Sequence, residues 1–204
     1  MSQKWVDREQ SATRRSARPR EVFIEAGPAA SVGLVAARLG VTQAALFQRV
    51  GSKRALMRSA LSPSWREART IVRALEAAPP PRGVDTQAKE ILSELGRFLA
   101  EVIPNLVVLR AAGPAMEQRG APPEGVPPTV RFRAALARWL ERAVSAGTIE
   151  PLDAEATAEA LLGAIEARCF NAYLGGRSFA PGDDEAFVCR MVEAFIHPLL
   201  QGER

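Results

Sequence analysis

Residues 31–56 read SVGLVAARLGVTQAALFQRVGSKRAL and carry the clearest structural pattern of the chain. Val32 and Leu39 lie on one face of a predicted helix, because apolar residues recur there at helical spacing. Gly40 ends that helix, since glycine adopts the left-handed conformation without strain. Thr42 is placed to cap a second helix with its side-chain oxygen. The stretch therefore predicts two helices that meet at an angle across a short turn.

The second of these helices is expected to run from about Thr42 to Val50. Leu46 and Val50 point back to the core that it shares with the first helix. This pattern is typical of a helix-turn-helix, in which the second helix offers its N-terminal residues to base edges in the major groove of DNA. The outward-facing residues are candidate DNA contacts or ordinary surface residues, and they are Gln43, Ala44, Phe47, Gln48 and Arg49.

The charge of the chain is divided unevenly along its length. Residues 1–60 hold 11 Lys and Arg against 4 acidic residues, whereas the remaining residues hold 16 against 19. The first segment therefore carries a formal charge of +7 and the rest −3. Such an asymmetry is expected when one end of a protein meets a polyanion. Charge alone does not separate DNA from RNA or anionic lipid.

Almost every long segment has helical rather than alternating periodicity, which predicts an all-α fold. One helix is expected to run from Lys53 toward Ala77, and Pro104 is expected to kink or end another. The other predicted helices lie at about 18–26, 31–39, 42–50, 85–109, 130–146, 153–174 and 184–200.

Residues 18–61 resemble the N-terminal DNA-binding domain of the TetR (tetracycline-repressor-like) family of bacterial regulators. The resemblance rests on Phe23 followed by Gly27, the turn Gly40-Val41-Thr42, Leu46, Phe47, and Ser52-Lys53 followed by Leu56. It implies that Lys53 is a phosphate ligand at a helix N-terminus. The predicted DNA-binding residues are Ser31, Thr42, Gln43, Ala44, Phe47, Gln48, Arg49 and Lys53.

The resemblance also implies the organisation of the whole chain. It predicts a helix-turn-helix domain at 18–61 and a helical ligand-binding and dimerisation domain at 62–204, and the basic residues before them predict a flexible arm at 1–17. Pro104 and the Gly/Pro-rich loop 113–128 interrupt continuous packing, which leaves room for a small apolar or amphipathic molecule. The candidate ligand-binding residues, whose aromatic members are equally candidates for the core, are Trp65, Phe98, Arg110, Phe132 and Trp139.

The last two predicted helices carry apolar residues over more than one face, which a monomer does not cover alone. They are expected to pair with their two-fold mates in a homodimer. The candidate interface residues are Leu161, Leu162, Ile165, Phe170, Phe187, Met191, Val192 and Phe195.

The composition limits the classes of function. The 204 residues include one histidine and two cysteines without a CxxC pattern, so we expect no metal site, no cofactor and no histidine-based active site. No apolar run reaches the roughly 18 residues of a membrane span, and we expect a cytoplasmic protein. The predicted function is a ligand-responsive repressor, bound as a homodimer to a palindromic operator. The alternative is a helical module that binds nucleic acid constitutively or without sequence preference, and an operator preference of about 10³ or more would separate the two.

Overall fold

The computed structural model describes residues 19–63, 65–79, 83–113, 128–176 and 181–200. The all-α prediction is confirmed, because the regular structure of these residues is helical apart from one isolated β-bridge between Ile149 and Leu200. Residues 19–26 form the first helical segment. It is followed by η1 (Gly27–Ala29), α2 (Val32–Leu39), α3 (Gln43–Val50), α4 (Lys53–Leu61), α5 (Trp65–Glu76), α6 (Val84–Ala111), α7 (Pro128–Ser145), α8 (Ala154–Leu174), α9 (Pro181–Phe195) and η3 (His197–Leu199).

The described residues divide into two compact units. The first unit contains residues 19–63 and 104–113, and the second contains 65–79, 83–103, 128–176 and 181–200. Helix α6 contributes to both, because the division falls at Pro104 inside it. The end of α6 therefore belongs to the unit that carries the helix-turn-helix. The predicted arm at 1–17 lies outside the described residues.

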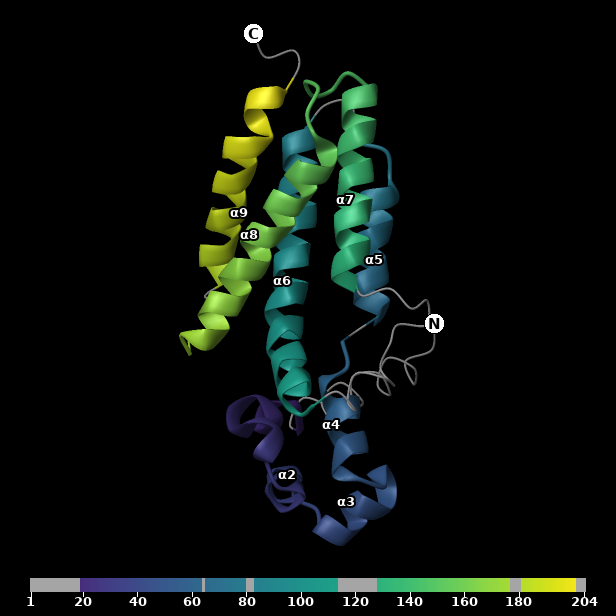
Figure 1. Ribbon diagram of the computed structural model, residues 1–204, viewed down its shortest axis with the longest axis vertical. Coiled ribbons are helices and arrows are strands. Elements are labelled where there is room, and N and C mark those ends of the chain that lie inside the picture. Colours follow the sequence, from purple (N-terminus) through teal and green to yellow (C-terminus); the bar gives the residue numbers. More distant parts are fainter. Residues whose placement is uncertain (1–18, 64, 80–82, 114–127, 177–180, 201–204) are drawn as a thin grey trace, which may run out of the picture. The chain divides into compact units, whose positions relative to one another are not determined.

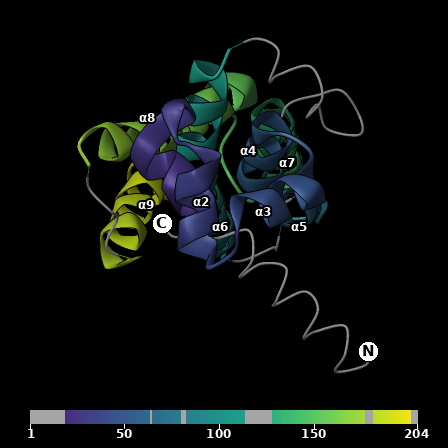
Figure 2. The ribbon, with the colours of Figure 1, turned by 90° about the horizontal axis from the view of Figure 1, so that it is seen from below.

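Three capping hydroxyls define the short helices of the first unit. Ser31, Thr42 and Ser52 each accept a hydrogen bond from the backbone N–H three residues later, at 3.1–3.2 Å. Gly40 closes α2 with φ at 69°, a conformation that favours glycine. The predicted turn between α2 and α3 is therefore confirmed, and Figure 2 shows the two helices in different directions.

The first unit has its own apolar core. Phe23 and Val35 are fully buried, and Leu46 of α3 is 6% exposed. Val108 of α6 lies in the same cluster, with Leu109 packed against it. The last turns of α6 are thus part of the core that supports α2 and α3.

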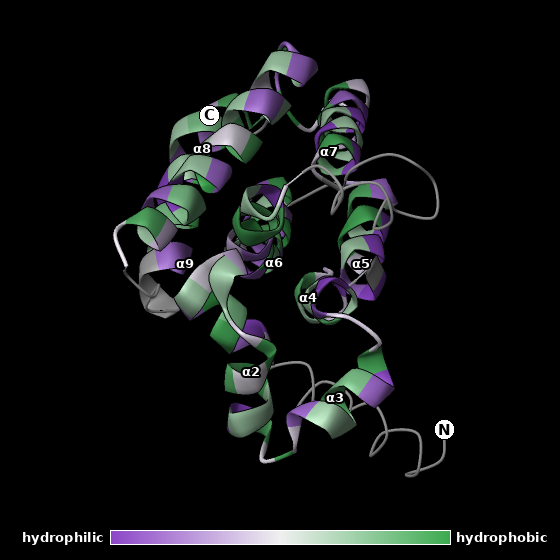
Figure 3. Ribbon diagram, turned by 60° about the horizontal axis from the view of Figure 1, so that its bottom comes forward, coloured by the Kyte–Doolittle hydropathy of each residue, from purple (hydrophilic) through white to green (hydrophobic). Residues whose placement is uncertain are grey.

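The second unit is a bundle of α5, the first part of α6, α7, α8 and α9. Helices α8 and α9 lie on one side of α6, and α5 and α7 lie on the other (Figures 1 and 3). On α5 and α7, hydrophilic residues gather on the side away from α6 (Figure 3). Arg142 of α7 donates to the carbonyl oxygens of Leu75 and Ala77, where α5 ends.

The predicted helix from Lys53 toward Ala77 is wrong. Helix α4 ends at Leu61 and α5 begins at Trp65. Pro63 explains the break, because proline disfavours helical backbone in the residue before it, and Ser62 is extended with ψ at 131°.

Two further helix boundaries differ from the prediction. Pro104 does not end α6, which continues to Ala111. The last helix ends at Phe195 rather than Leu200, and Pro198 lies in the short η3 that follows. None of the described helices is both long and apolar enough to cross a membrane.

Candidate nucleic-acid interface

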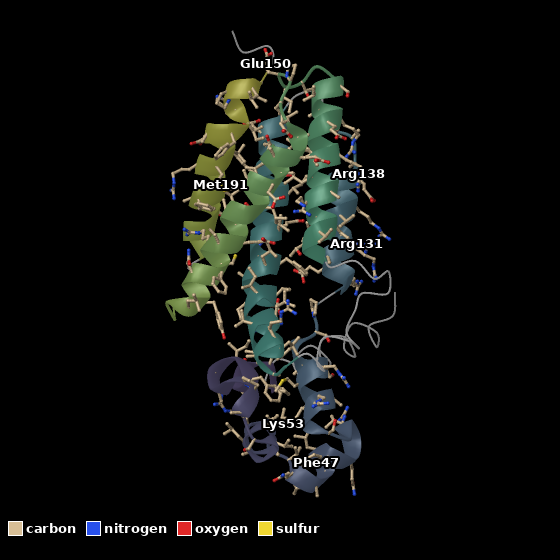
Figure 4. All side chains as sticks on the ribbon, in the orientation of Figure 1. Phe47, Lys53, Arg131, Arg138, Glu150 and Met191 are labelled. Atoms are coloured by element: carbon tan, nitrogen blue, oxygen red, sulfur yellow. The ribbon has the colours of Figure 1, made fainter. Side chains whose placement is uncertain are left out.

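Helix α3 presents the predicted contact face to solvent. Leu46 is buried and Val50 is partly buried against the core of the first unit, as predicted. Phe47 is 37% exposed, and Figure 4 shows it on α3. The other outward residues are also exposed, namely Gln43, Ala44, Gln48 and Arg49. All five residues that the sequence predicted to face outward are therefore exposed, and Ala45, which was not predicted, is exposed as well.

Ser31 and Thr42, both predicted DNA contacts, have a structural role here. Each is exposed, and each uses its hydroxyl oxygen to cap a helix, α2 and α3 respectively. Such a hydroxyl fixes the helix start while keeping its own proton available for donation. The two residues thus hold the first turns of α2 and α3 in place.

Lys53 is the first residue of α4 and is partly exposed (Figure 4). The first turns of α2, α3 and α4, which all lie in the described part of the chain, contain no acidic residue. The positive end of each helix dipole is therefore not offset by a carboxylate in its first turn. Lys53 beside backbone N–H groups is a suitable arrangement for a phosphate.

Gly33 lies beside the side chain of Gln43, a proximity that the sequence did not predict. A Cβ added at Gly33 would lie 3.3 Å from Oε1 of Gln43, so the missing side chain leaves space for that amide. A glycine inside a helix costs about 1 kcal/mol relative to alanine. Gly33 inside the predicted helix was therefore the feature of the sequence that could have pointed to this proximity.

A pocket of about 420 Å³ lies in the first unit beside α3. Its lining is mostly apolar and consists of Pro19, Leu39, Val41, Ala45, Leu46, Arg49, Val50, Leu56, Ser59 and Ala60. None of these residues was proposed as a small-molecule ligand, and Arg49 is the member that was predicted to contact DNA.

Three of the candidate ligand-binding residues are buried in the core of the second unit. Phe98 and Phe132 are buried and pack edge to face, with ring centroids 5.4 Å apart. Trp139 is also buried and donates its Nε1 hydrogen to Gln87 at 3.1 Å. These three rings form packed core in this structure. Arg110 belongs to the first unit, and the side chain of Trp65 lies outside what the structure describes.

The candidate dimer residues fall into two groups. Phe170 and Phe195 are 42% and 50% exposed, and Phe187 is partly buried. The other five are buried within the single chain and contribute to its core: Leu161, Leu162, Ile165, Met191 and Val192. Leu174, 64% exposed at the end of α8, was not predicted. Helical periodicity could not separate the two groups, because α8 is apolar on several faces.

Burial raises the pKa of a few titratable groups among the described residues of the second unit. Burial, with Asp184 nearby, raises the pKa of the Cys169 thiol to about 11, so that thiol stays protonated near neutral pH. Burial and the neighbouring Glu159 raise the pKa of Glu166, which lines a polar cleft of about 110 Å³ between α7 and α8. Within the described ranges, no group of three or more His, Cys, Asp and Glu side chains is placed to hold a metal ion.

Comparison with known proteins identifies both the C-terminal part and the fold. Residues 128–197 match the family described as the C-terminal domain of AefR-like transcriptional repressors. A comparison with curated protein sequences finds no match.

Three solved structures illustrate the similarity in fold. The TetR-family regulator PfmR from Thermus thermophilus is 21% identical over 94% of this chain and 99% of its own, with a TM-score of 0.63. NalD from Pseudomonas aeruginosa, the secondary repressor of the MexAB-OprM multidrug efflux pump, is 16% identical over 95% and 98%, with a TM-score of 0.57. FadR from Bacillus subtilis, in complex with stearoyl-CoA, is 17% identical over 91% and 99%, with a TM-score of 0.58. The predicted resemblance to the TetR family is confirmed: the chain has the fold of TetR-family transcriptional regulators, and its residues 128–197 match a repressor C-terminal domain.

Proposed function

We propose that this chain is a ligand-responsive transcriptional repressor that binds a palindromic operator as a homodimer. The observation that carries the proposal is α3, which buries Leu46 and exposes Gln43, Phe47 and Gln48 on a unit that the sequence makes basic. Glutamine side chains donate to and accept from the major-groove edge of adenine, and Lys53 would hold a phosphate.

Operator selection tests this proposal. Full-length protein is incubated with a pool of random DNA duplexes, the bound duplexes are amplified over several rounds, and the enriched sequences are read. We expect one inverted repeat, with half-sites about one DNA turn, or 34–36 Å, apart. Enrichment of no sequence, with all duplexes bound alike, would favour the alternative of a non-specific nucleic-acid-binding module.

The homodimer would form through the outer faces of α8 and α9. Ala160, Gly163, Ala167, Phe170 and Leu174 are all exposed on α8 and recur every three or four residues. No described residue comes within 4 Å of the position of a Cβ on Gly163, so no contact in the described part of the chain requires a glycine there. A close approach by a second copy of α8 would explain it, and Phe195 extends the apolar face onto α9.

The effector would be a small apolar or amphipathic molecule bound within the second unit. The stearoyl-CoA bound to FadR, a protein of the same fold, supports this class of molecule. Because Phe98, Phe132 and Trp139 are packed, a ligand would have to displace core contacts and open the site. A series of fatty acids and acyl-CoA thioesters, tested by thermal shift and then for release of the selected operator, would identify the effector.

A further inference from the structure

Asn105 is the only polar residue buried within the described part of the chain, at 2% exposed. It lies in the last part of α6, inside the apolar run VIPNLVVL, and belongs to the first unit. Its neighbour along the helix face, Val108, is part of the core of that unit. A polar side chain in this position is costly unless it is hydrogen-bonded.

The partner of Asn105 is Arg20, from the helical segment at 19–26. Nε of Arg20 donates to Oδ1 of Asn105 at 3.0 Å, across 85 residues of sequence. Apolar contacts between helices are not directional, whereas a hydrogen bond requires a narrow range of distances and angles. The pair therefore selects one orientation of the segment 19–26 on the end of α6.

The segment 19–26 in turn supports the helix-turn-helix. Its Phe23 is fully buried in the same cluster as Val35 of α2 and Leu46 of α3. Glu25, at its other end, forms an ion pair with Arg38 of α2, with Oε2 and Nη2 3.2 Å apart. A change in orientation of this segment would therefore reach α2 and α3 through packed side chains.

Pro104 directly precedes Asn105. Proline has no N–H to donate to the carbonyl oxygen of Ala100 one turn earlier, so the backbone of α6 is less constrained here than elsewhere. The side-chain hydrogen bond of Asn105 therefore lies next to the position where α6 lacks a backbone hydrogen bond.

We propose that Arg20 and Asn105 are positioning residues for operator recognition: their hydrogen bond fixes the segment 19–26 on the last turns of α6 and thereby sets the orientation of α3. The inference rests on the proposed DNA-binding function. Neither residue needs to touch DNA for this role. The hydrogen bond would reduce the number of orientations that α3 adopts in the free protein, so that the two copies of α3 in the dimer fit the two half-sites together.

The test compares the affinity for the selected operator with the affinity for random duplexes of equal length. Asn105→Ala removes the acceptor of this hydrogen bond, and Arg20→Lys removes its guanidinium donor. Neither variant changes the formal charge of the first unit. We expect each to lower the operator-to-random ratio by about fivefold or more, with affinity for random DNA within about twofold, because non-specific binding depends on charge rather than orientation. The double variant should lose little more than either single one.

Leu106→Ala, at the exposed neighbour of Asn105, is the matched control and should keep the wild-type ratio. Asn105→Asp, which keeps an acceptor for Arg20, should retain most of the ratio and is informative even if Asn105→Ala fails to fold. A wild-type ratio in Asn105→Ala and Arg20→Lys, both folded, would overturn the positioning role. A wild-type protein without any operator preference would instead contradict the proposed function itself.

Discussion

Lys53 offers the simplest test of a single contact. Replacement by alanine should weaken binding to all duplexes about equally and lower the slope of log K against log salt by roughly 1, because one phosphate contact releases about one counterion. Gln43→Ala should instead change which base is preferred without changing the slope. Titrations across a salt series measure both, and an unchanged affinity and slope for Lys53→Ala would remove its phosphate role.

Gly33→Ala provides a second test, because we expect it to keep or raise the stability of the protein while it changes the base preference. Gly33→Ala should favour helix α2 by up to about 1 kcal/mol. The new Cβ would lie 3.3 Å from Oε1 of Gln43, so that exposed side chain has to shift. We expect an unfolding temperature at or above that of the wild type, together with altered base preference in a repeated operator selection. A preference identical to the wild type would mean that the space at Gly33 has no role in recognition.

Among the helices, α5 depends on a side chain from α7. The Arg142 guanidinium donates to carbonyl oxygens of Leu75 and Ala77, which would otherwise lack helical donors. Arg142→Ala should reduce the free energy of unfolding by about 1–3 kcal/mol. Arg138→Ala, at an exposed position one turn earlier on α7, is the control and should change it by less than about 0.5 kcal/mol. Equal losses in denaturant titrations of the two variants would contradict the capping role.

The helices were predicted well where local chemistry determines them. Thr42 and Gly40 marked the boundary between α2 and α3, because capping and a left-handed turn are properties of individual residues. The break at Pro63 was also visible locally but was missed, and the prediction extended one helix across it. Pro104 was read as a possible end, yet packing of the residues after it keeps α6 helical.

The exposure of the candidate site residues was predicted better on α3 than on α8, for a physical reason. Helix α3 buries Leu46 and partly buries Val50, so most of its exposed residues were identifiable from periodicity. On α8 buried and exposed apolar residues follow one another, and only the fold shows that Leu161 is inside and Leu174 outside. The Arg20–Asn105 bond joins residues 85 positions apart and has no local pattern beyond a polar residue in an apolar run.

Assembly of the whole molecule is tested by charges on the outer face of α8 and α9. Leu174→Glu combined with Phe195→Glu should convert a dimer to a monomer of 22.0 kDa, because both side chains are at least half exposed in the single chain. Leu34→Glu on α2 of the first unit, 43% exposed, is the control and should remain dimeric. Sedimentation velocity at micromolar concentration distinguishes the monomer from the dimer. A wild-type chain that sediments at 22.0 kDa would contradict the palindromic-operator mechanism.

The most direct measurement is the ratio of dissociation constants for random duplex and selected operator, taken with the full-length protein at physiological salt. A dimeric regulator that places two copies of α3 in successive major grooves should prefer its operator by about 10³ or more. We predict that ratio for the wild type. A ratio near one, with binding that depends on salt alone, would contradict sequence-specific recognition and leave a basic helical protein that binds nucleic acid through charge.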